Sequence, residues 1–534
     1  MNRESIGVII CSCSGRNLGK QEIDSITQRL SFAESGIRNM IIETALCGED
    51  TLKSLKNEVE KKGISSLIIA GCGAARISGV TEKIADALSF APSSILGVPL
   101  FYSEGAESEK NKLGINEARV DKAVRGISRG MNVLTSQEPL EIEEIPVVQR
   151  ALVIGGGAAG IYTADALNRF GHETVLVEKK DSLSDYGIDE KKLKDLEGVI
   201  IHTGSSLVSL EGSKGNFSAC VKTPGGLEEY QAGAVVIASG APVPADPKKY
   251  LQNRFGSSSA VPLFSLATAY SGLPRIPSLR RIGILLDLDR DEGRASTQMA
   301  LHAAQEIQKP NAAEVFLFLR DARVGSLHLE ELYDAVRDMG VTIVKYSGEA
   351  KISSLETGLQ VTVQDDGLGV LTDYTCDLLG ISPFGCAAEE DDPLSEITGV
   401  HLDDYGQFQD NNIQLMPVET NIPGIFTAGG GRGEVYSPKV KQEALAAAGE
   451  VHFLLKNKTL HLERSEAQVD PDKCILCLTC IRCCPHGAMH VNREDGVAEC
   501  STAACQRCGI CAGECPAKAI SLPVWTDEIV LNQL

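Results

Sequence analysis

The order of apolar and polar stretches predicts a chain built mainly from alternating strands and helices. Short apolar runs, typical of buried strands, alternate with longer polar stretches typical of helices. The apolar runs are IGVIICS (6–12), SSLIIAGC (65–72), ALVIG (151–155), AGAVVIAS (232–239), RIGILLDL (281–288), EVFLFLR (314–320) and VTIVKY (341–346). Because strands that alternate with helices form parallel sheets, we expect an α/β fold.

The chain divides into several predicted domains. With 534 residues it is too long for one hydrophobic core, and a length of this order suggests about three or four domains. The predicted parts are an N-terminal α/β domain (1–137), an acidic linker (138–149), a discontinuous nucleotide-binding domain (150–275 and 372–460), a central domain (276–371) and a Cys-rich domain with a tail (461–534).

The charge and the cysteine content narrow the function classes. The formal net charge of −21 argues against nucleic acid or an anionic membrane as a partner. No run approaches the roughly 20 apolar residues of a membrane helix, and the N-terminus has no secretory signal pattern, so we expect a cytoplasmic protein. In that compartment the 17 cysteines are expected to have metal or redox roles.

Ten of the cysteines lie between residues 474 and 515, where the sequence contains a short internal duplication. Each half has the spacing C-x2-C-x2-C-x3-C-P. In this bacterial ferredoxin run, three thiolates bind one [4Fe–4S] cluster and the fourth binds the other. Zinc sites usually have two CxxC pairs with a longer gap, so iron–sulfur is favoured. The predicted ligands are Cys474, Cys477, Cys480 and Cys515 for one cluster, and Cys505, Cys508, Cys511 and Cys484 for the other.

Two further cysteines of this block, Cys483 and Cys500, fall outside the repeated spacing. We expect them to be bystanders rather than ligands.

The segment ALVIGGGAAG has the Gly-x-Gly-x-x-Gly spacing of a dinucleotide site, directly after an apolar strand. Gly155 would allow the tight turn, Gly157 the close approach of the pyrophosphate, and Gly160 the packing of helix on strand. Phosphates bound there would meet the positive end of the next helix, which begins near Ala158 and Ala159.

The strand that follows this helix ends at Glu178, which is followed by Lys179. An acid at this position suits the hydroxyl groups of an adenosine ribose. By itself it does not separate FAD from NAD.

Two later segments separate the two cofactors. The segment AGAVVIASGAP looks like the strand-then-ATG element of two-dinucleotide flavoproteins, with Ser239 in place of Thr before Gly240. The segment TNIPGIFTAGG resembles their second flavin fingerprint, T-x5-F-x2-G-D, with Gly429 in place. Gly430 stands where the Asp would bind the ribityl chain, so that hydrogen bond must come from backbone or elsewhere. FAD is the expected cofactor.

The central domain shows no second nucleotide loop. Its first strand is followed by LDLDRDEGRAS, which has no Gly-x-Gly-x-x-Gly. Without that turn the pyrophosphate has no close backbone approach, and Asp287 and Asp289 would repel it. Direct oxidation of NAD(P)H at this domain is therefore not expected.

The order of these segments resembles the HdrA-like family over essentially the whole chain. Proteins of this family are the flavin subunit of heterodisulfide reductase, found in electron-bifurcating complexes of anaerobes. The resemblance lies in IGVIICSCSG with IIAGCGAARI, in IEEIPVVQRALVIGGGAAG, in GNFSACV, in FLFLRDARVGSLHLEELYDAVRDMGV and in the ferredoxin tail. It implies a thioredoxin-reductase-like, two-dinucleotide-binding (Rossmann-type) flavoprotein with a small N-terminal α/β domain and a C-terminal 2[4Fe–4S] ferredoxin domain.

The resemblance implies two further sites. The family's N-terminal domain can carry a third [4Fe–4S] cluster, whose candidate ligands are Cys11, Cys13, Cys47 and Cys72. Buried free thiols are the alternative. Lys439 follows a proline as in the family and would lie near the isoalloxazine, where its charge could stabilise reduced flavin. A surface lysine at a helix start is the alternative.

The implied partners are a thiol- or disulfide-handling B/C pair, a hydrogenase, formate dehydrogenase or NADH-oxidising module that supplies electrons, and ferredoxin, with a homodimer inside the larger complex. The chain lacks the additional Cys-rich insertion of some members, so bifurcation, confurcation and plain electron relay stay open. Two other classes compete: a stand-alone NAD(P)H oxidoreductase similar to the small subunit of glutamate synthase, and an iron–sulfur scaffold that has lost its flavin.

Overall fold

The structure is a computed structural model with two compact units, Met1–Ile145 with Leu460–Leu534 and Pro146–Thr459, called unit 1 and unit 2 below. The described residues are 5–12, 18–33, 39–43, 46, 48–88, 90–101, 117–137, 140–183, 198–240, 246–270, 280–289, 293–309, 313–325, 328–382, 393–404, 406–412, 415–433 and 437–533.

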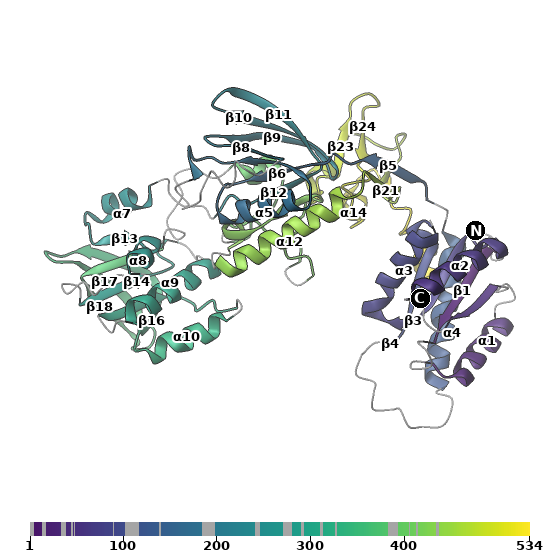
Figure 1. Cartoon of the computed structure of the whole chain (residues 1–534), viewed down its shortest axis with the longest axis horizontal. Helices are drawn as coiled ribbons and strands as arrows, with labels where there is room; N and C mark the ends of the chain where they lie inside the picture. The colour runs from purple at the N-terminus through teal and green to yellow at the C-terminus, as the bar shows by residue number, and fades with distance from the viewer. Residues whose placement is uncertain are drawn as a thin grey trace. The chain divides into compact units, whose positions relative to one another are not determined.

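The N-terminal part of unit 1 is a parallel sheet with helices on both faces (Figure 1), and its strand order is β2-β1-β3-β4. Alternate residues of β1 point to opposite faces, as the two-residue period of a strand requires. Val8 and Ile10 pack with α1 and α4, whereas Ile9 and Cys11 pack with α2 and α3. The elements are β1 (Ile6–Cys11), α1 (Lys20–Ala33), β2 (Asn39–Glu43), α2 (Glu49–Lys62), β3 (Ser66–Gly73), α3 (Ala74–Leu88), η2 (Pro92–Ser94), β4 (Ile95–Phe101) and α4 (Glu117–Ser136).

The C-terminal part of unit 1 consists of two halves with the same local structure. Strand β22 pairs with β25 and places Val469 opposite Ile520, while β23 pairs with β24 and places Met489 opposite Cys500. A short helix carries the third cysteine of each half, and a last helix, α15, packs against α4. The elements are β22 (Gln468–Val469), α13 (Thr479–Cys483), β23 (Met489–Asn492), β24 (Val497–Cys500), α14 (Ile510–Glu514), β25 (Ile520–Ser521) and α15 (Asp527–Gln533).

The acidic segment predicted as a linker contains a strand. Strand β5 (Ile142–Pro146) forms a two-stranded sheet with β21 (Thr459–Glu463). All five residues of β5 are exposed or half-buried, so the strand buries little apolar surface. The hydrophobic pattern of the segment therefore contains no strong strand signal.

The first half of unit 2 is a five-stranded parallel sheet of the order β20-β12-β6-β7-β8. An antiparallel sheet, β11-β10-β9, packs on one face, where Phe217 and Val221 join Leu152 and Val235 in one core. Helices α5 and α12 pack against each other and against β6 and β12. The elements are β6 (Arg150–Ile154), α5 (Ala158–Arg169), β7 (Glu173–Val177), β8 (Val199–His202), β9 (Ser206–Ser213), β10 (Asn216–Thr223), β11 (Gly226–Ala232), β12 (Ala234–Ile237), α11 (Leu394–Thr398), β20 (Ile425–Thr427), η6 (Gly429–Arg432) and α12 (Ser437–Leu455).

The second half of unit 2 is a seven-stranded sheet of the order β13-β19-β14-β15-β16-β17-β18. It extends beyond the predicted range 276–371 at both ends, because β13 and β19 are too short to be recognised from a hydrophobic run. The elements are α7 (Pro247–Phe255), β13 (Ala260–Pro262), α8 (Leu263–Tyr270), β14 (Arg281–Leu285), α9 (Gly293–Gln308), β15 (Glu314–Leu319), α10 (Leu329–Asp338), β16 (Thr342–Ser354), β17 (Leu359–Asp365), β18 (Val370–Cys376) and β19 (Leu378–Ile381).

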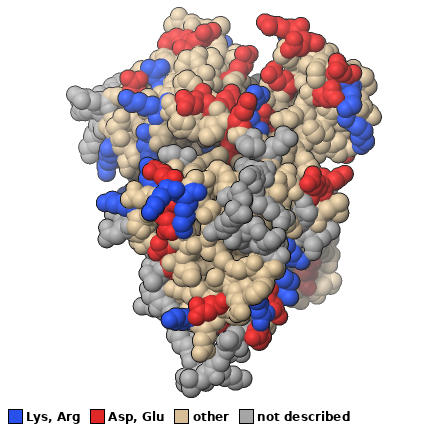
Figure 2. Space-filling view, turned by 90° about the vertical axis from the view of Figure 1, so that its right-hand side faces the viewer, with Lys and Arg blue, Asp and Glu red and all other residues tan. Residues whose placement is uncertain are grey.

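Acidic and basic side chains are interspersed on the molecular face in Figure 2. Within the described part of the chain, none of the helices combines the length and the apolar character that crossing a membrane requires.

Candidate functional site

The glycine-rich turn between β6 and α5 has a backbone that only glycine permits. Gly155 has φ +110°, and a Cβ atom there would lie 2.2 Å from the carbonyl oxygen of Ala238. A Cβ atom on Gly160 would lie 1.8 Å from the carbonyl oxygen of Gly155. Strand β12, the turn and helix α5 are therefore so close together that a side chain would not fit between their backbones. A dinucleotide turn requires this close packing.

The N-terminus of α5 is open to an anion. Gly157 caps this helix without a side-chain hydrogen bond, and the first turn begins with Ala158 and Ala159. Small side chains leave the N–H groups of the first turn accessible to a phosphate, which the helix dipole also favours. A Cβ atom on Gly429 would lie 2.7 Å from the Cβ of Ala159, so the second predicted fingerprint adjoins the start of α5.

Glu178 lies directly after β7, at the mouth of the turn. Its carboxylate accepts hydrogen bonds from the backbone N–H groups of Gly156 and Lys180, and the residue is buried, whereas the adjoining Lys179 is exposed. The predicted ribose acceptor is therefore held beside the glycine turn by the backbone on both sides.

Two buried hydroxyl groups lie at the carboxyl edge of the parallel sheet. Ser239 follows β12 and Thr427 ends β20, and these two strands are paired neighbours. Neither Ser239 Oγ nor Thr427 Oγ1 has a hydrogen-bond partner among the described residues. A buried hydroxyl without a partner costs free energy, so the two hydroxyls are suited to a polar ligand. Together with the glycine turn, they make the residues present fit a dinucleotide such as FAD.

The turn after β20 is held by a buried ion-pair network that was not predicted from the sequence. The guanidinium of Arg432 bonds to Glu443 on α12 and, at 2.6 Å, to Asp410. The side chains of Arg432 and Glu443 are 4% and 8% exposed. Gly429 donates its backbone N–H to the same Glu443 carboxylate. The sequence contains two signals for this network. One is an arginine two residues after the fingerprint, and the other is a glutamate on the helix that follows.

Gly430 and Lys439 flank this network. Gly430 lies in the 3-10 turn η6, so it has no side chain to replace the expected Asp. Gly240 lies close to this turn, because a Cβ atom on Gly431 would be 3.4 Å from the Gly240 carbonyl oxygen. Lys439 is in the first turn of α12 and is half-buried. Its role beside the flavin stays a prediction.

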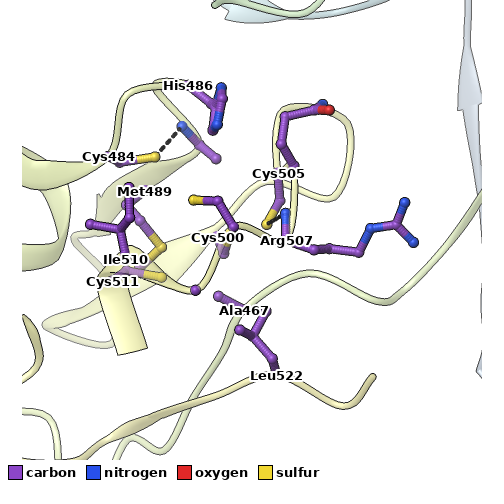
Figure 3. A pocket seen from close by; sticks show the side chains of 14 residues that line it. Ala467, Cys484, His486, Met489, Cys500, Cys505, Arg507, Ile510, Cys511 and Leu522 are labelled. Atoms are coloured by element: carbon purple, nitrogen blue, oxygen red, sulfur yellow. Dashed lines mark hydrogen bonds between the residues drawn. The ribbon is translucent and has the colours of Figure 1, made fainter. Parts of the chain in front are cut away.

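The predicted cluster ligands gather in two pockets in the crossed arrangement. The residues around the first pocket include Cys474, Cys477, Cys480 and Cys515. The residues around the second include Cys484, Cys505, Cys508 and Cys511, and Figure 3 shows Cys484, Cys505 and Cys511 around it. The fourth cysteine of each half thus lies with the first three of the other half.

Backbone N–H groups point at the sulfurs of both pockets. Ala488 donates to Cys484 Sγ and Ala519 donates to Cys515 Sγ, each at 3.3 Å. Hydrogen bonds of this kind stabilise thiolates that bind a cluster. Because the two bonds occupy equivalent places in the two halves, the repeated sequence produces a repeated local geometry.

The two cysteines outside the repeated spacing differ in position. The thiol of Cys483 donates to the carbonyl oxygen of Cys480, 3.6 Å away. Cys500 lines the second pocket together with Cys505. The interaction between these two side chains raises the pKa of Cys500 and lowers the pKa of Cys505. Cys500 is therefore part of the pocket, although its place outside the repeated spacing does not indicate this.

The N-terminal cysteines are described in part. Cys11 ends β1 and Cys72 lies near the end of β3, and these strands are parallel neighbours. Both are therefore at the carboxyl edge of the sheet, where a Cβ atom on Gly71 would lie 2.9 Å from the Cβ of Cys11. Cys13 and Cys47 lie outside the described residues.

The acids of the central domain are engaged by the protein itself. Asp287 has φ +58° and accepts a hydrogen bond from the backbone N–H of Arg320. Both terminal guanidinium nitrogens of Arg254 bind the Asp289 carboxylate. A dinucleotide site needs a glycine turn at the end of the first strand of this domain. That position is instead occupied by two aspartates, each of which is hydrogen-bonded to another residue of the protein.

Comparison with known protein families supports both kinds of site. A family described as "Pyridine nucleotide-disulphide oxidoreductase" matches residues 105–251, and one described as "4Fe-4S binding domain" matches residues 467–489. The chain is thus an oxidoreductase of the thioredoxin-reductase-like fold, with FAD and iron–sulfur clusters as its cofactors. A solved structure of T. acidophilum thioredoxin reductase aligns with 58% of this chain and 98% of its own at 15% identity, with a TM-score of 0.36.

Curated relatives cover nearly the whole chain. The second iron–sulfur A-type subunit of CoB–CoM heterodisulfide reductase from Methanopyrus kandleri is 22% identical over 92% of this chain and 92% of its own length. The A-type subunit of H2:CoB-CoM heterodisulfide,ferredoxin reductase from Methanothermobacter thermautotrophicus is 21% identical over 94% of this chain and 93% of its own. Over nearly its whole length the chain is therefore similar to the iron–sulfur A-type subunits of heterodisulfide reductases.

Proposed function

We propose that the chain is the electron-transfer subunit of a heterodisulfide-reductase-like complex, in which electron pairs from a donor module pass through FAD to [4Fe–4S] clusters. The observation that carries this proposal is the crossed gathering of eight cysteines in two pockets in the same chain as a dinucleotide turn. The proposed cluster ligands are Cys474, Cys477, Cys480 and Cys515 for the first cluster, and Cys505, Cys508, Cys511 and Cys484 for the second.

In this proposal the FAD is bound by the carboxyl edge of the five-stranded sheet. The N-terminal turn of α5 binds the pyrophosphate, Glu178 binds the ribose, and the hydroxyls of Ser239 and Thr427 bind polar groups of the cofactor. The backbone of Gly429 and Gly430 takes the place of the missing Asp. The support is the glycine turn, which leaves no room for side chains, and the two buried hydroxyls.

When bound, FAD supplies the exchange between electron pairs and single electrons, and the clusters accept one electron each. The chain's own contribution is to hold these groups. Arg432 and Glu443 fix the turn that adjoins α5, and Lys439 places a positive charge in the first turn of α12. The backbone N–H groups of Ala488 and Ala519 stabilise the negative charge on cluster sulfurs, because a charge-assisted hydrogen bond is stronger than a neutral one.

A third cluster in the N-terminal domain is part of the proposal. The support is the position of Cys11 and Cys72 at one edge of the parallel sheet, where Cys13 and Cys47 would complete the ligand set.

The proposed partners follow from the relatives. The names of the relatives include heterodisulfide and ferredoxin, together with H2 or formate. We propose thiol- or disulfide-handling B/C-like subunits, a hydrogenase, formate dehydrogenase or NADH-oxidising module, and ferredoxin for this chain as well. We further propose that the complex carries out flavin-based electron bifurcation and that it contains two copies of this chain.

The test is the spectrum and composition of anaerobically purified protein. We expect one FAD and, for two cubanes, about eight irons with an equal amount of acid-labile sulfide per chain, or about twelve if the N-terminal cluster is present. NADH alone should leave the flavin bands unchanged, whereas dithionite should bleach them. Bleaching by NADH alone would contradict the proposal and favour a stand-alone NAD(P)H oxidoreductase.

A further inference from the structure

The two halves of the C-terminal cysteine domain differ at one equivalent position. Val469 lies opposite Ile520 in one ladder, and Cys500 lies opposite Met489 in the other. Val469 and Cys500 each stand five residues before the first cysteine of their half. The same place in the repeated structure therefore carries a valine in one half and a thiol in the other.

The thiol lies in the second cluster pocket. Cys500 is among the residues that line this pocket together with the four proposed ligands, and Figure 3 shows its side chain among those of Cys484, Cys505 and Cys511. The side chain of Cys505 belongs to the same lining and lies next to that of Cys500 in Figure 3. An apolar part of the same lining is formed by Ala467, Met489 and Leu522, so a hydrogen bond formed by the Cys500 thiol there would be in a setting of low polarity.

A thiol and a valine have different effects on a cluster. The S–H group can donate a hydrogen bond, and a valine side chain cannot. Reduction adds one electron, and so one negative charge, to a cluster and its sulfurs. A donor to a ligand sulfur stabilises that charge and raises the reduction potential.

We propose that Cys500 donates its S–H to the Cys505 sulfur and thereby gives the cluster of Cys484, Cys505, Cys508 and Cys511 a higher reduction potential than the same site would have with valine. Val469 provides no such donor to the other cluster. Reduction adds one electron from the flavin side to the cluster, and the Cys500 proton stays on its sulfur. This inference rests on the proposed function, because it requires both clusters.

The experiment is a potentiometric titration of the anaerobically purified full chain, followed by electron paramagnetic resonance. In Cys500→Val we expect the reduction potential of the second cluster to fall by about 59 mV. For a one-electron couple this equals a shift of about tenfold in the distribution of an electron between the two clusters, away from the second cluster. Cys500→Ser keeps a donor and should keep the higher potential. Val469→Cys, the matched variant in the other half, should move the potential of the first cluster upward.

Three results would overturn parts of this picture in different ways. Unchanged potentials in a Cys500→Val protein that retains all its iron would overturn the inference alone. Loss of about four irons in that variant would also overturn it, because Cys500 would then be a ligand of a cubane. An unmodified protein without iron and acid-labile sulfide would overturn the proposed function, and the inference with it.

Discussion

The backbone N–H of Gly429 donates a hydrogen bond to the carboxylate of Glu443, 3.0 Å away, and so ties the turn after β20 to helix α12. The other oxygen of that carboxylate binds Arg432, and a Cβ atom on Gly429 would lie against Ala159 at the start of α5. Glu443 therefore controls the position of a backbone segment beside the proposed pyrophosphate site.

Replacement of Glu443 by Ala should release FAD and destabilise unit 2. The variant removes one of the two carboxylates that bind the buried Arg432 guanidinium, and removal of one member of a buried ion pair costs about 3–5 kcal/mol. The measurements are the ratio of flavin to protein absorbance after gel filtration and the midpoint of urea denaturation. Glu58→Gln is the control, since Glu58 forms a partly exposed pair with Lys62 that contributes about 0.3–0.5 kcal/mol. Equal flavin content in the Glu443 variant and the unmodified protein would refute this prediction.

Gly160→Ala should abolish FAD binding, because its Cβ would lie 1.8 Å from the Gly155 carbonyl oxygen. Helix and strand would have to separate at the proposed pyrophosphate site. Gly449→Ala is the matched control on α12, where nothing lies within 4 Å of the added Cβ. That change should stabilise the helix by about 0.5–1 kcal/mol and leave flavin binding intact. The measurement is the flavin content of the two purified variants. Equal flavin content in both would count against the proposed site.

Cys484→Ser and Cys483→Ser should differ in iron content although the residues are adjacent. Cys484 lines the second pocket, whereas the Cys483 thiol bonds to the Cys480 carbonyl oxygen. We expect the Cys484 variant to fall from about eight irons in the two cubanes toward about four, with loss of the second cluster, and the Cys483 variant to keep its full content. Iron and sulfide analysis after anaerobic purification is the measurement. The reverse pattern would show that the crossed assignment is wrong.

The stability of unit 2 should fall in mild acid because of His172. Burial, and then the nearby His452, lower the pKa of His172, whose Nε2 lies 2.8 Å from His452 Nδ1. The folded protein therefore binds a proton less readily than the unfolded chain, so its stability decreases as pH falls through the ordinary histidine pKa of about 6.5. Urea midpoints at about pH 7.5 and pH 5.5, on either side of that pKa, should differ less in His172→Gln than in the unmodified protein.

The exposed His461 offers the control for that measurement. His461→Gln should keep the pH dependence of the unmodified protein. If His172→Gln showed the same pH dependence as well, the acid sensitivity would have to come from other groups.

The turn at Gly155 and Gly160 was predictable from sequence because its geometry depends on a few neighbouring residues. The division of cysteines between two pockets was predictable because the ferredoxin spacing is repeated. The network of Arg432, Glu443 and Asp410 was not, since its members lie on separate elements and each alone looks like an ordinary surface charge. Only the packing of α12 against the turn brings them together.

Cys500 shows where the sequence holds more information than the cysteine spacing alone. Its place outside the repeated spacing favours a bystander. A residue-by-residue alignment of the two halves pairs it with Val469 and marks it as a difference beside the pocket. The extent of the central sheet is harder to predict, because β13 and β19 contribute only three and four residues.

The packing of α15 on α4 has a consequence for synthesis of the protein. Residues 527–533 leave the ribosome long after the helix they cover, so the matching face of α4 must wait for a segment made much later. Unit 1 can therefore be assembled in full only after all of unit 2 has been translated, and this face of α4 stays uncovered by α15 in the interval.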